Sequence, residues 1–200
     1  MRRSGSLAVT ALGALALCAA QASATEFTSV YSGVKRNDCV YLNSWLPPSL
    51  PYDGEAPVPC QNFQGYGVAY AYSGSVLSFR VRMPGVTDAA DRLRVGYDYG
   101  GRVEWRGRRR SGVFKPHAAI VRLIWTRETG VKVHALGILR VEAGAVCGAA
   151  LVDADANRNA IALARTAADE TARRFQCGRD TPALRGAAGA AVREALVLFR

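Results

Sequence analysis

Histidine is scarce in this chain, and the motifs that usually identify an enzyme are missing. Only two histidines occur among the 200 residues, and no two cysteines stand in a C-x-x-C pair. A zinc site of the common Cys/His type therefore lacks ligands at the right spacing. No G-x-S-x-G sequence is present, which disfavours a serine hydrolase with a nucleophile elbow. These absences make an enzyme the less favoured interpretation, and they point to no cofactor.

Long apolar runs are also lacking, apart from one near the N-terminus. Residues 7–20 are mostly apolar, follow two arginines and precede the small residues Ala22–Ala24. Such a pattern is typical of a secretory signal peptide, here with cleavage before Thr25. The run is shorter than the about 20 residues that span a bilayer. We predict a cleaved signal over 1–24 and a periplasmic or secreted mature protein without a transmembrane span.

Four cysteines remain after the signal is removed. In an exported chain an even count indicates disulfides, and four cysteines allow three connectivities. The pairing expected joins sequence neighbours, Cys39 with Cys60 and Cys147 with Cys177. Each bridge would stabilise the fold by about 2–4 kcal/mol.

Alternating apolar and polar residues dominate the chain after the signal. This period of two is typical of half-buried antiparallel strands. Turns are expected at Ser73–Gly74, at Gly100–Gly101 and over 126–130. Strands are expected in eight segments, 26–34, 65–72, 75–83, 92–99, 102–106, 117–125, 131–141 and 145–152.

The period changes to three or four residues in the last quarter of the chain, which indicates one face of a helix. The pairs Asp169–Arg173 and Glu170–Arg174 have the spacing of outer-face ion pairs. Cys177-Gly178 is a usual helix stop. The expected helix face consists of Ile161, Ala164, Ala168, Ala172 and Phe175.

The predicted fold is therefore α+β. It consists of an antiparallel meander of about seven to eight strands packed on one long C-terminal helix, with two disulfides. Residues 25–180 form a single globular domain, and residues 181–200 form a weakly ordered or short-helix tail.

The stretch VDADANRNA, residues 152–160, resembles the start of a calcium loop. A calcium loop needs glycine at its sixth position and glutamate at its twelfth, where this chain has Arg158 and Ala164. Asp155 or Asn157 just before a helical pattern instead suits an N-cap, whose side chain accepts a free backbone N–H. We interpret the stretch as a helix start, and no metal site is predicted.

The two histidines are expected on paired strands. If 117–125 pairs with 131–141, His134 lies opposite about Leu123, and His117 is near 20 Å away along that strand. The two side chains then cannot share a metal ion.

The densest basic stretch is RVEWRGRRRSGVFK, residues 102–115. Arginine forks grip phosphate and carboxylate oxygens, so this segment is the candidate anion-binding site. The alternative is a solvated hairpin extension in an arginine-rich chain. The candidate ligand-binding residues are Arg106, Arg108, Arg109, Arg110 and Lys115.

Net charge supports an anionic partner. The formal charge of +10 falls by two, to +8, when Arg2 and Arg3 leave with the signal. A basic exported protein is attracted to lipopolysaccharide, anionic lipid, acidic glycan or an acidic envelope protein. Nucleic acid is disfavoured because the protein is exported. The alternative is that the arginine content reflects a genome rich in G and C.

The stretches FTSVY, KRNDC, VEWR and, most specifically, the segment from Cys147 to Cys177 together resemble a group of small exported proteobacterial proteins of unknown function. The similarity covers most of residues 26–180. It implies export and a two-disulfide layout, but it suggests no activity, because none is known for the group.

Three functions follow from the sequence, in order of preference. The first is a non-enzymatic envelope protein that binds an anionic surface or partner through 102–115. The second is a carrier of an apolar ligand in a cavity between sheet and helix, by analogy with lipocalin-like and helix-grip folds. The third is a hydrolase with a non-standard site.

Overall fold

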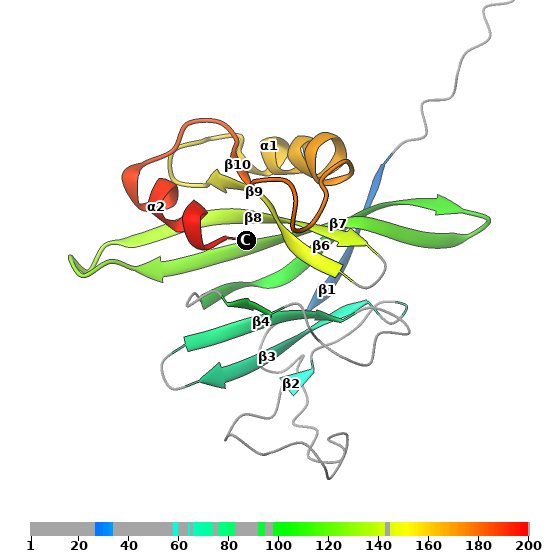
Figure 1. The fold of residues 1–200 in the computed structure, drawn as a ribbon, viewed down its shortest axis with the longest axis horizontal. Helices are drawn as coiled ribbons and strands as arrows, with labels where there is room; N and C mark the ends of the chain where they lie inside the picture. The colour runs from blue at the N-terminus through cyan, green and yellow to red at the C-terminus, as the bar shows by residue number, and fades with distance from the viewer. Residues whose placement is uncertain are drawn as a thin grey trace, which may run out of the picture.

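Two β-sheets, built mostly from the alternating segments, form the frame of the protein (Figure 1). The computed structural model describes residues 27–33, 58–59, 64, 66–73, 76–82, 92–94, 98–142 and 145–199, and the side chains of 27–33, 64, 66, 101–142 and 146–199. The larger sheet contains, in spatial order, β1 (Thr28–Gly33), β6 (Asp98–Arg110), β7 (Val113–Thr126), β8 (Lys132–Glu142), β9 (Ala145–Asp153) and β10 (Ala183–Leu184). The smaller sheet contains β2 (Val58–Pro59), β3 (Gly67–Ser73), β4 (Val76–Arg82) and β5 (Arg92–Arg94).

The predicted α+β class is confirmed, and the centre of the larger sheet is an antiparallel meander of β6, β7, β8 and β9. Strand β1 lies antiparallel at the outer edge of β6, whereas β10 lies parallel to β9. The expected single meander of seven to eight strands is therefore divided. Strands β3 and β4 pair with each other in the smaller sheet and are not part of the larger one.

The expected turn at Gly100–Gly101 is wrong. Both glycines lie within the 13-residue strand β6, where the pairing with β7 shifts register between Tyr99 and Val103. Glycine inside a strand is typical of such an irregularity, as well as of a turn. The segment 92–99 consequently does not form one strand, and its two ends belong to different sheets.

The expected single long helix is also wrong. The helical segment is α1 (Ala160–Thr166), which continues directly into a wider π-helical turn, η2 (Ala167–Ala172). A second helix, α2 (Ala190–Leu198), follows in the tail. The first segment ends before Cys177 because the chain turns back to the sheet there: Phe175 is buried, and Cys177 is bonded to β9.

The helix face agrees with the expectation at four of its five positions. Ala164, Ala168, Ala172 and Phe175 are buried, whereas Ile161 is 41% exposed. Together with Ala160 and Ala167, the four buried residues pack on Ala118, Ile120, Leu136, Ile138, Ala149, Ala150 and Val152 of the sheet.

The opposite face of the sheet is covered by α2. Val192, Ala195 and Phe199 are buried there among strand residues. The Phe199 ring lies so close to two strand glycines that a Cβ on Gly137 or Gly148 would approach it within 3 Å. Residues 181–199 thus contribute a strand and a short helix to the same core as the meander.

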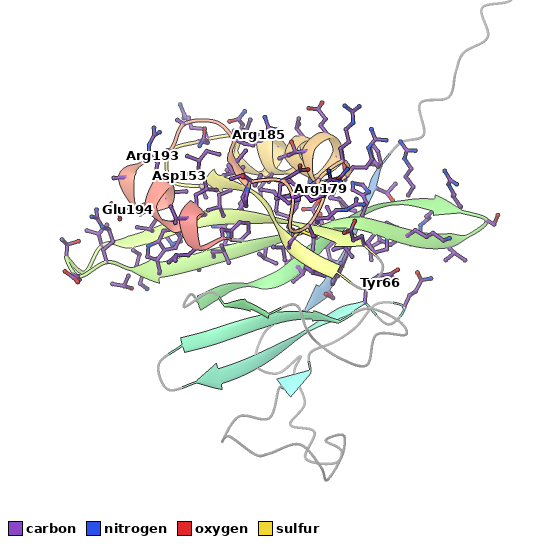
Figure 2. The ribbon with its side chains drawn as sticks, in the orientation of Figure 1. Tyr66, Asp153, Arg179, Arg185, Arg193 and Glu194 are labelled. Carbon is purple, nitrogen blue, oxygen red and sulfur yellow. A yellow bond between two sulfur atoms is a disulfide. The ribbon has the colours of Figure 1, made fainter. Side chains whose placement is uncertain are left out.

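Trp105 belongs to this second face and is fully buried. Its ring centroid lies 6.0 Å from that of Tyr66, and Tyr66 lies on the side of the larger sheet that faces the smaller one (Figure 2).

The disulfide between Cys147 and Cys177 is confirmed, with a Cα–Cα distance of 5.7 Å. It ties β9 to the segment that follows η2. The other expected bridge, Cys39–Cys60, and the predicted signal over 1–24 lie outside the described residues. Among the residues that are described, no helix is long and apolar enough to cross a membrane.

Candidate functional site

The candidate site is organised by strand β6, which carries charged side chains at every second position. Because strand side chains alternate between faces, these residues share the face on which α1 and η2 pack. They are Arg102, Glu104, Arg106, Arg108 and Arg110. The helix offers Arg165, Asp169 and Arg173, which are four residues apart and thus lie along one side of it.

Two contacts between these rows are complementary ion pairs. Arg165 Nε lies 2.7 Å from Glu104 Oε1, and the hydrogen bond to Glu104 raises the pKa of Arg165. The Arg106 guanidinium binds Asp169 through Nε, at 3.1 Å, and through Nη2. Arg106 also donates to Ser29 Oγ at 2.8 Å. Charge is therefore balanced along the middle of the helix.

The third contact between strand and helix is different, because two arginines, Arg108 and Arg173, share one aromatic ring. The Arg108 guanidinium lies 4.1 Å from the centroid of the Phe27 ring, and that of Arg173 lies 5.6 Å from it. No carboxylate of the described residues pairs with either side chain. Nε of Arg108 is buried and has no hydrogen-bond partner. Such an unsatisfied buried donor is costly, so the site is set up for an acceptor that the chain itself does not supply.

A hollow of about 260 Å³ lies at this third contact. Its lining combines cationic side chains with an aromatic ring and a proline. The residues that line it are Phe27, Arg108, Arg110, Lys115, Pro116, His117 and Arg173. We call it the basic hollow.

A β-bulge shapes the basic hollow. Arg106 pairs with Ala118, but the next residue, Gly107, pairs with Pro116, so His117 is the extra residue on β7. This insertion changes which side chains face the helix, since it places Lys115 opposite Arg108 and Phe114 opposite Arg109.

His117 lies at the inner end of the basic hollow. Its Nε2 is 3.1 Å from the carbonyl oxygen of Ala168 and 3.5 Å from Asp169 Oδ1. Burial lowers the pKa of His117, and the negative charge of Asp169 opposes this only in part. The side chain is therefore mostly neutral near neutral pH.

Three of the five predicted ligand-binding residues meet in the basic hollow, namely Arg108, Arg110 and Lys115. Arg106 is instead held in the ion pair with Asp169. Arg109 lies on the opposite face, with its guanidinium 5.9 Å from the centroid of the Phe114 ring.

The sequence interpretation missed Phe27, His117 and Arg173. Arg173 was assigned to an outer-face pair with Asp169, which is wrong because Asp169 binds Arg106. The alternation of charge along β6 was visible in the sequence. The position of Phe27 was not, because it depends on β1 pairing with a strand about 75 residues away.

The stretch VDADANRNA is a polar turn rather than a helix cap. The N-cap of α1 is Asn159, which makes no side-chain cap hydrogen bond, so the expected caps at Asp155 and Asn157 are wrong. Asp153 Oδ1 accepts hydrogen bonds from the N–H groups of Asp155 and Ala156, and its Oδ2 accepts one from Gly189. Figure 2 shows Asp153 beside α2.

Asn157 completes this polar turn by holding the tail. Its Nδ2 donates to the carbonyl oxygens of Asp153 and Ala187, at 2.8 and 2.7 Å, and its Oδ1 accepts from the Ala187 N–H. The polar side chains of the turn are thus used by the protein. No group of three or more His, Cys, Asp or Glu among the described side chains could hold a metal ion.

The two histidines are far apart. His134 pairs with Ile124, seven residues along β7 from His117, which is about 23 Å at 3.3 Å per residue. Nδ1 of His134 lies 2.9 Å from Asp155 Oδ1. Burial by itself would raise the pKa of Asp155, but hydrogen bonds from the backbone N–H and ring of His134 lower it overall.

Comparison with known proteins adds no relative: the chain matches no protein-family model, and no curated protein or solved structure is similar enough to count as a match. The geometry of the molecule itself is therefore the basis for a functional proposal.

Proposed function

We propose that this protein is an exported, non-enzymatic protein of the cell envelope that binds an anionic component through the basic hollow. The observation that carries the proposal is the placement of the Arg108 and Arg173 guanidinium groups on the same aromatic ring, that of Phe27. Both guanidinium groups lie against the Phe27 ring without a carboxylate partner, directly next to two ion pairs built from the same strand and helix.

Energetics support this proposal. Both guanidinium groups lie within about 10 Å of each other, since each is close to the same ring centroid. Like charges at this separation repel each other, and salt screens the repulsion only in part. An anion seated between them would remove that repulsion, satisfy the buried Nε of Arg108 and receive forked hydrogen bonds.

We do not extend the proposal to an apolar ligand. The cavity of that alternative would lie along the alanine face of the helix. Ala164, Ala168 and Ala172 are completely buried there, in direct contact with the sheet. The small side chains thus bring the helix close to the strands.

The experiment is equilibrium binding of the mature protein, residues 25–200, to three anionic probes at about 50 mM and about 500 mM salt. The probes are phosphatidylglycerol vesicles, lipopolysaccharide and oligogalacturonate, and vesicles of phosphatidylcholine serve as the uncharged reference. We expect binding to at least one anionic probe, weakened by high salt, and none to the uncharged vesicles.

Charge-reversal variants locate the site. R108E/R110E should weaken binding at least tenfold, because it inverts two of the four cations around the basic hollow. The matched control is R109E, which alters the same hairpin on its other face and should retain wild-type binding within about twofold. Equal losses in both variants, or no binding to any anionic probe, would overturn the proposal.

A further inference from the structure

A second cationic hollow lies beside the first half of the helix, on the same face of the sheet. Its volume is about 240 Å³, and Arg102, Arg122 and Arg165 line it together with Tyr31 and the apolar residues Ile120 and Leu136. The Arg102 guanidinium lies 4.7 Å from the centroid of the Tyr31 ring. We call it the second hollow.

Two of the three arginines in the second hollow form no ion pair with a described residue, although the charge of Arg122 helps to lower the pKa of Asp155. Arg165 is used by its ion pair with Glu104, which also lines the hollow. Arg102 and Arg122 are both exposed, and neither forms an ion pair with a described residue. The second hollow thus repeats the design of the basic hollow: free arginines, one of them stacked on an aromatic ring of β1 or its flank.

The two hollows are aligned along β6. Arg102 and Arg108 are six residues apart on one face of the strand, which corresponds to about 20 Å. Between them lie the ion pairs Glu104–Arg165 and Arg106–Asp169, and each pair has no net charge. The acidic residues Glu170 and Asp180 line a different hollow, so their negative charges do not lie in either of these two.

We infer that the two hollows are subsites of one binding face for a linear polyanion, an acidic glycan whose charged groups reach both at once. This inference rests on the proposed function and narrows the envelope component to one class. Each subsite offers arginine forks that bind carboxylate or phosphate oxygens, and in each an aromatic ring, Phe27 or Tyr31, holds a guanidinium group in place by stacking.

The shape of this face favours a chain over a membrane surface. Helix α1 lies on one face of the larger sheet (Figure 1). Arg165 of α1 lines the second hollow, and Arg173, just after η2, lines the basic hollow. A planar bilayer resting against the protein would meet the helix, whereas an extended chain can follow β6 beside it. The cations of the two subsites lie mostly exposed on either side of the ion pairs that join β6 to the helix.

Simultaneous use of two subsites has a measurable signature. Once one end of a chain is bound, its other end has an effective concentration in the millimolar range at the second subsite. Affinity therefore rises in a step when the chain becomes long enough to span about 20 Å. A single subsite would give a smooth rise with the number of charges.

The experiment titrates mature protein with oligogalacturonates of defined, increasing length at low salt. We expect a step of about 100-fold in affinity at the spanning length. R102E/R122E should abolish this step, and R102Q/R122Q should reduce it without introducing new negative charge. R109E should keep it. Thermal unfolding of each variant checks that the fold is intact.

The outcomes separate this inference from the proposed function. A smooth rise with length, or R102E/R122E behaving like R109E, overturns the two-subsite inference and leaves the basic hollow as the binding site. Binding to anionic vesicles but to no oligogalacturonate also overturns it. Failure of every anionic probe overturns both.

Discussion

The polar turn at 153–157 and the basic hollow are both dense in polar side chains. In the turn these side chains have partners within the protein, whereas in the hollow some of them do not. In the polar turn, Asp153 and Asn157 bond backbone groups of the turn and of the tail. In the basic hollow, Arg108 and Arg173 lie against the same aromatic ring without a carboxylate partner, and the buried Nε of Arg108 is unsatisfied. In the linear sequence the polar turn looks the more like a ligand site; in three dimensions the basic hollow is the better candidate.

The difference between the two regions shows that polar density alone does not identify a site. A polar group that the protein already satisfies contributes to stability, and removing it costs free energy of folding. A charged group left without a partner contributes little to stability and is available for a ligand. Mutations in the two regions should therefore have opposite effects on folding and binding.

The largest effect is expected for Asp153→Ala. This change leaves three backbone N–H groups without their acceptor, on a side chain that is 5% exposed. The free energy of unfolding should fall by about 3 kcal/mol, measured by chemical denaturation. Glu194→Ala, at an exposed position on α2, should change it by less than about 0.5 kcal/mol. If Asp153→Ala left the free energy of unfolding unchanged, the turn would not hold the tail.

A smaller loss is expected for Asn157→Ala, which removes two hydrogen bonds between the polar turn and the tail and one within the turn. The loss should be about 1–2 kcal/mol, because the site is partly open to water. The matched control is Asn159→Ala, since Asn159 is the N-cap but makes no side-chain cap hydrogen bond. Comparable losses for the two asparagines would contradict this account.

Mutations in the basic hollow should affect anion binding strongly and stability little. The double variant Arg108→Met and Arg173→Met removes the two like charges beside Phe27 and puts an unbranched apolar side chain in place of each arginine. Stability should not fall by more than about 0.5 kcal/mol, since the lost cation–π attraction is offset by relieved repulsion and by removal of the unsatisfied Arg108 Nε. Anion binding should be lost in the same protein.

Arg106→Met provides the contrast within one strand. It leaves the half-buried Asp169 carboxylate without its main partner, so unfolding free energy should fall by about 2 kcal/mol or more. If the double variant at positions 108 and 173 is as destabilised as this one, the third contact is structural.

The smallest effect concerns pH and His117. Its pKa in the folded protein lies below the ordinary 6.5, so in the interval between them the unfolded chain binds more protons. Stability should therefore decrease as pH falls through 6.5 and level off below the folded pKa. Denaturation at about pH 7.5 and about pH 5.5 measures the decrease.

His117→Gln is the control for this pH dependence, because it removes the titrating group next to Asp169 and Arg106. The variant should lose less stability than the wild type over the same interval. Superimposable pH profiles for the two proteins would assign the decrease to other groups.

Much of the fold could be predicted from the sequence. The strands β7 to β9 and the part of β6 after Gly101 were visible because their residues alternate, and the pairing of β7 with β8 agreed to within one residue at His134. The Cys147–Cys177 bridge followed from nearness in sequence. The length of the helix was overestimated, because a continuous pattern of period 3.6 contains no signal for the return of Phe175 and Cys177 to the sheet.

The candidate site was predictable only in part. Sequence located the basic hairpin but not which of its cations face the helix. That choice depends on the bulge at His117, which reverses the alternation and places Lys115 beside Arg108. It also depends on β1 and η2, which bring Phe27 and Arg173 to the same hollow.

The sequence by itself determined the β-rich α+β class, the positive charge and the small helix face, because these follow from local periodicity and composition. Only the tertiary structure decided which charges are paired. An ion pair such as Arg106–Asp169 joins residues 63 positions apart, and no local pattern records whether a distant strand and helix present opposite charges or like ones.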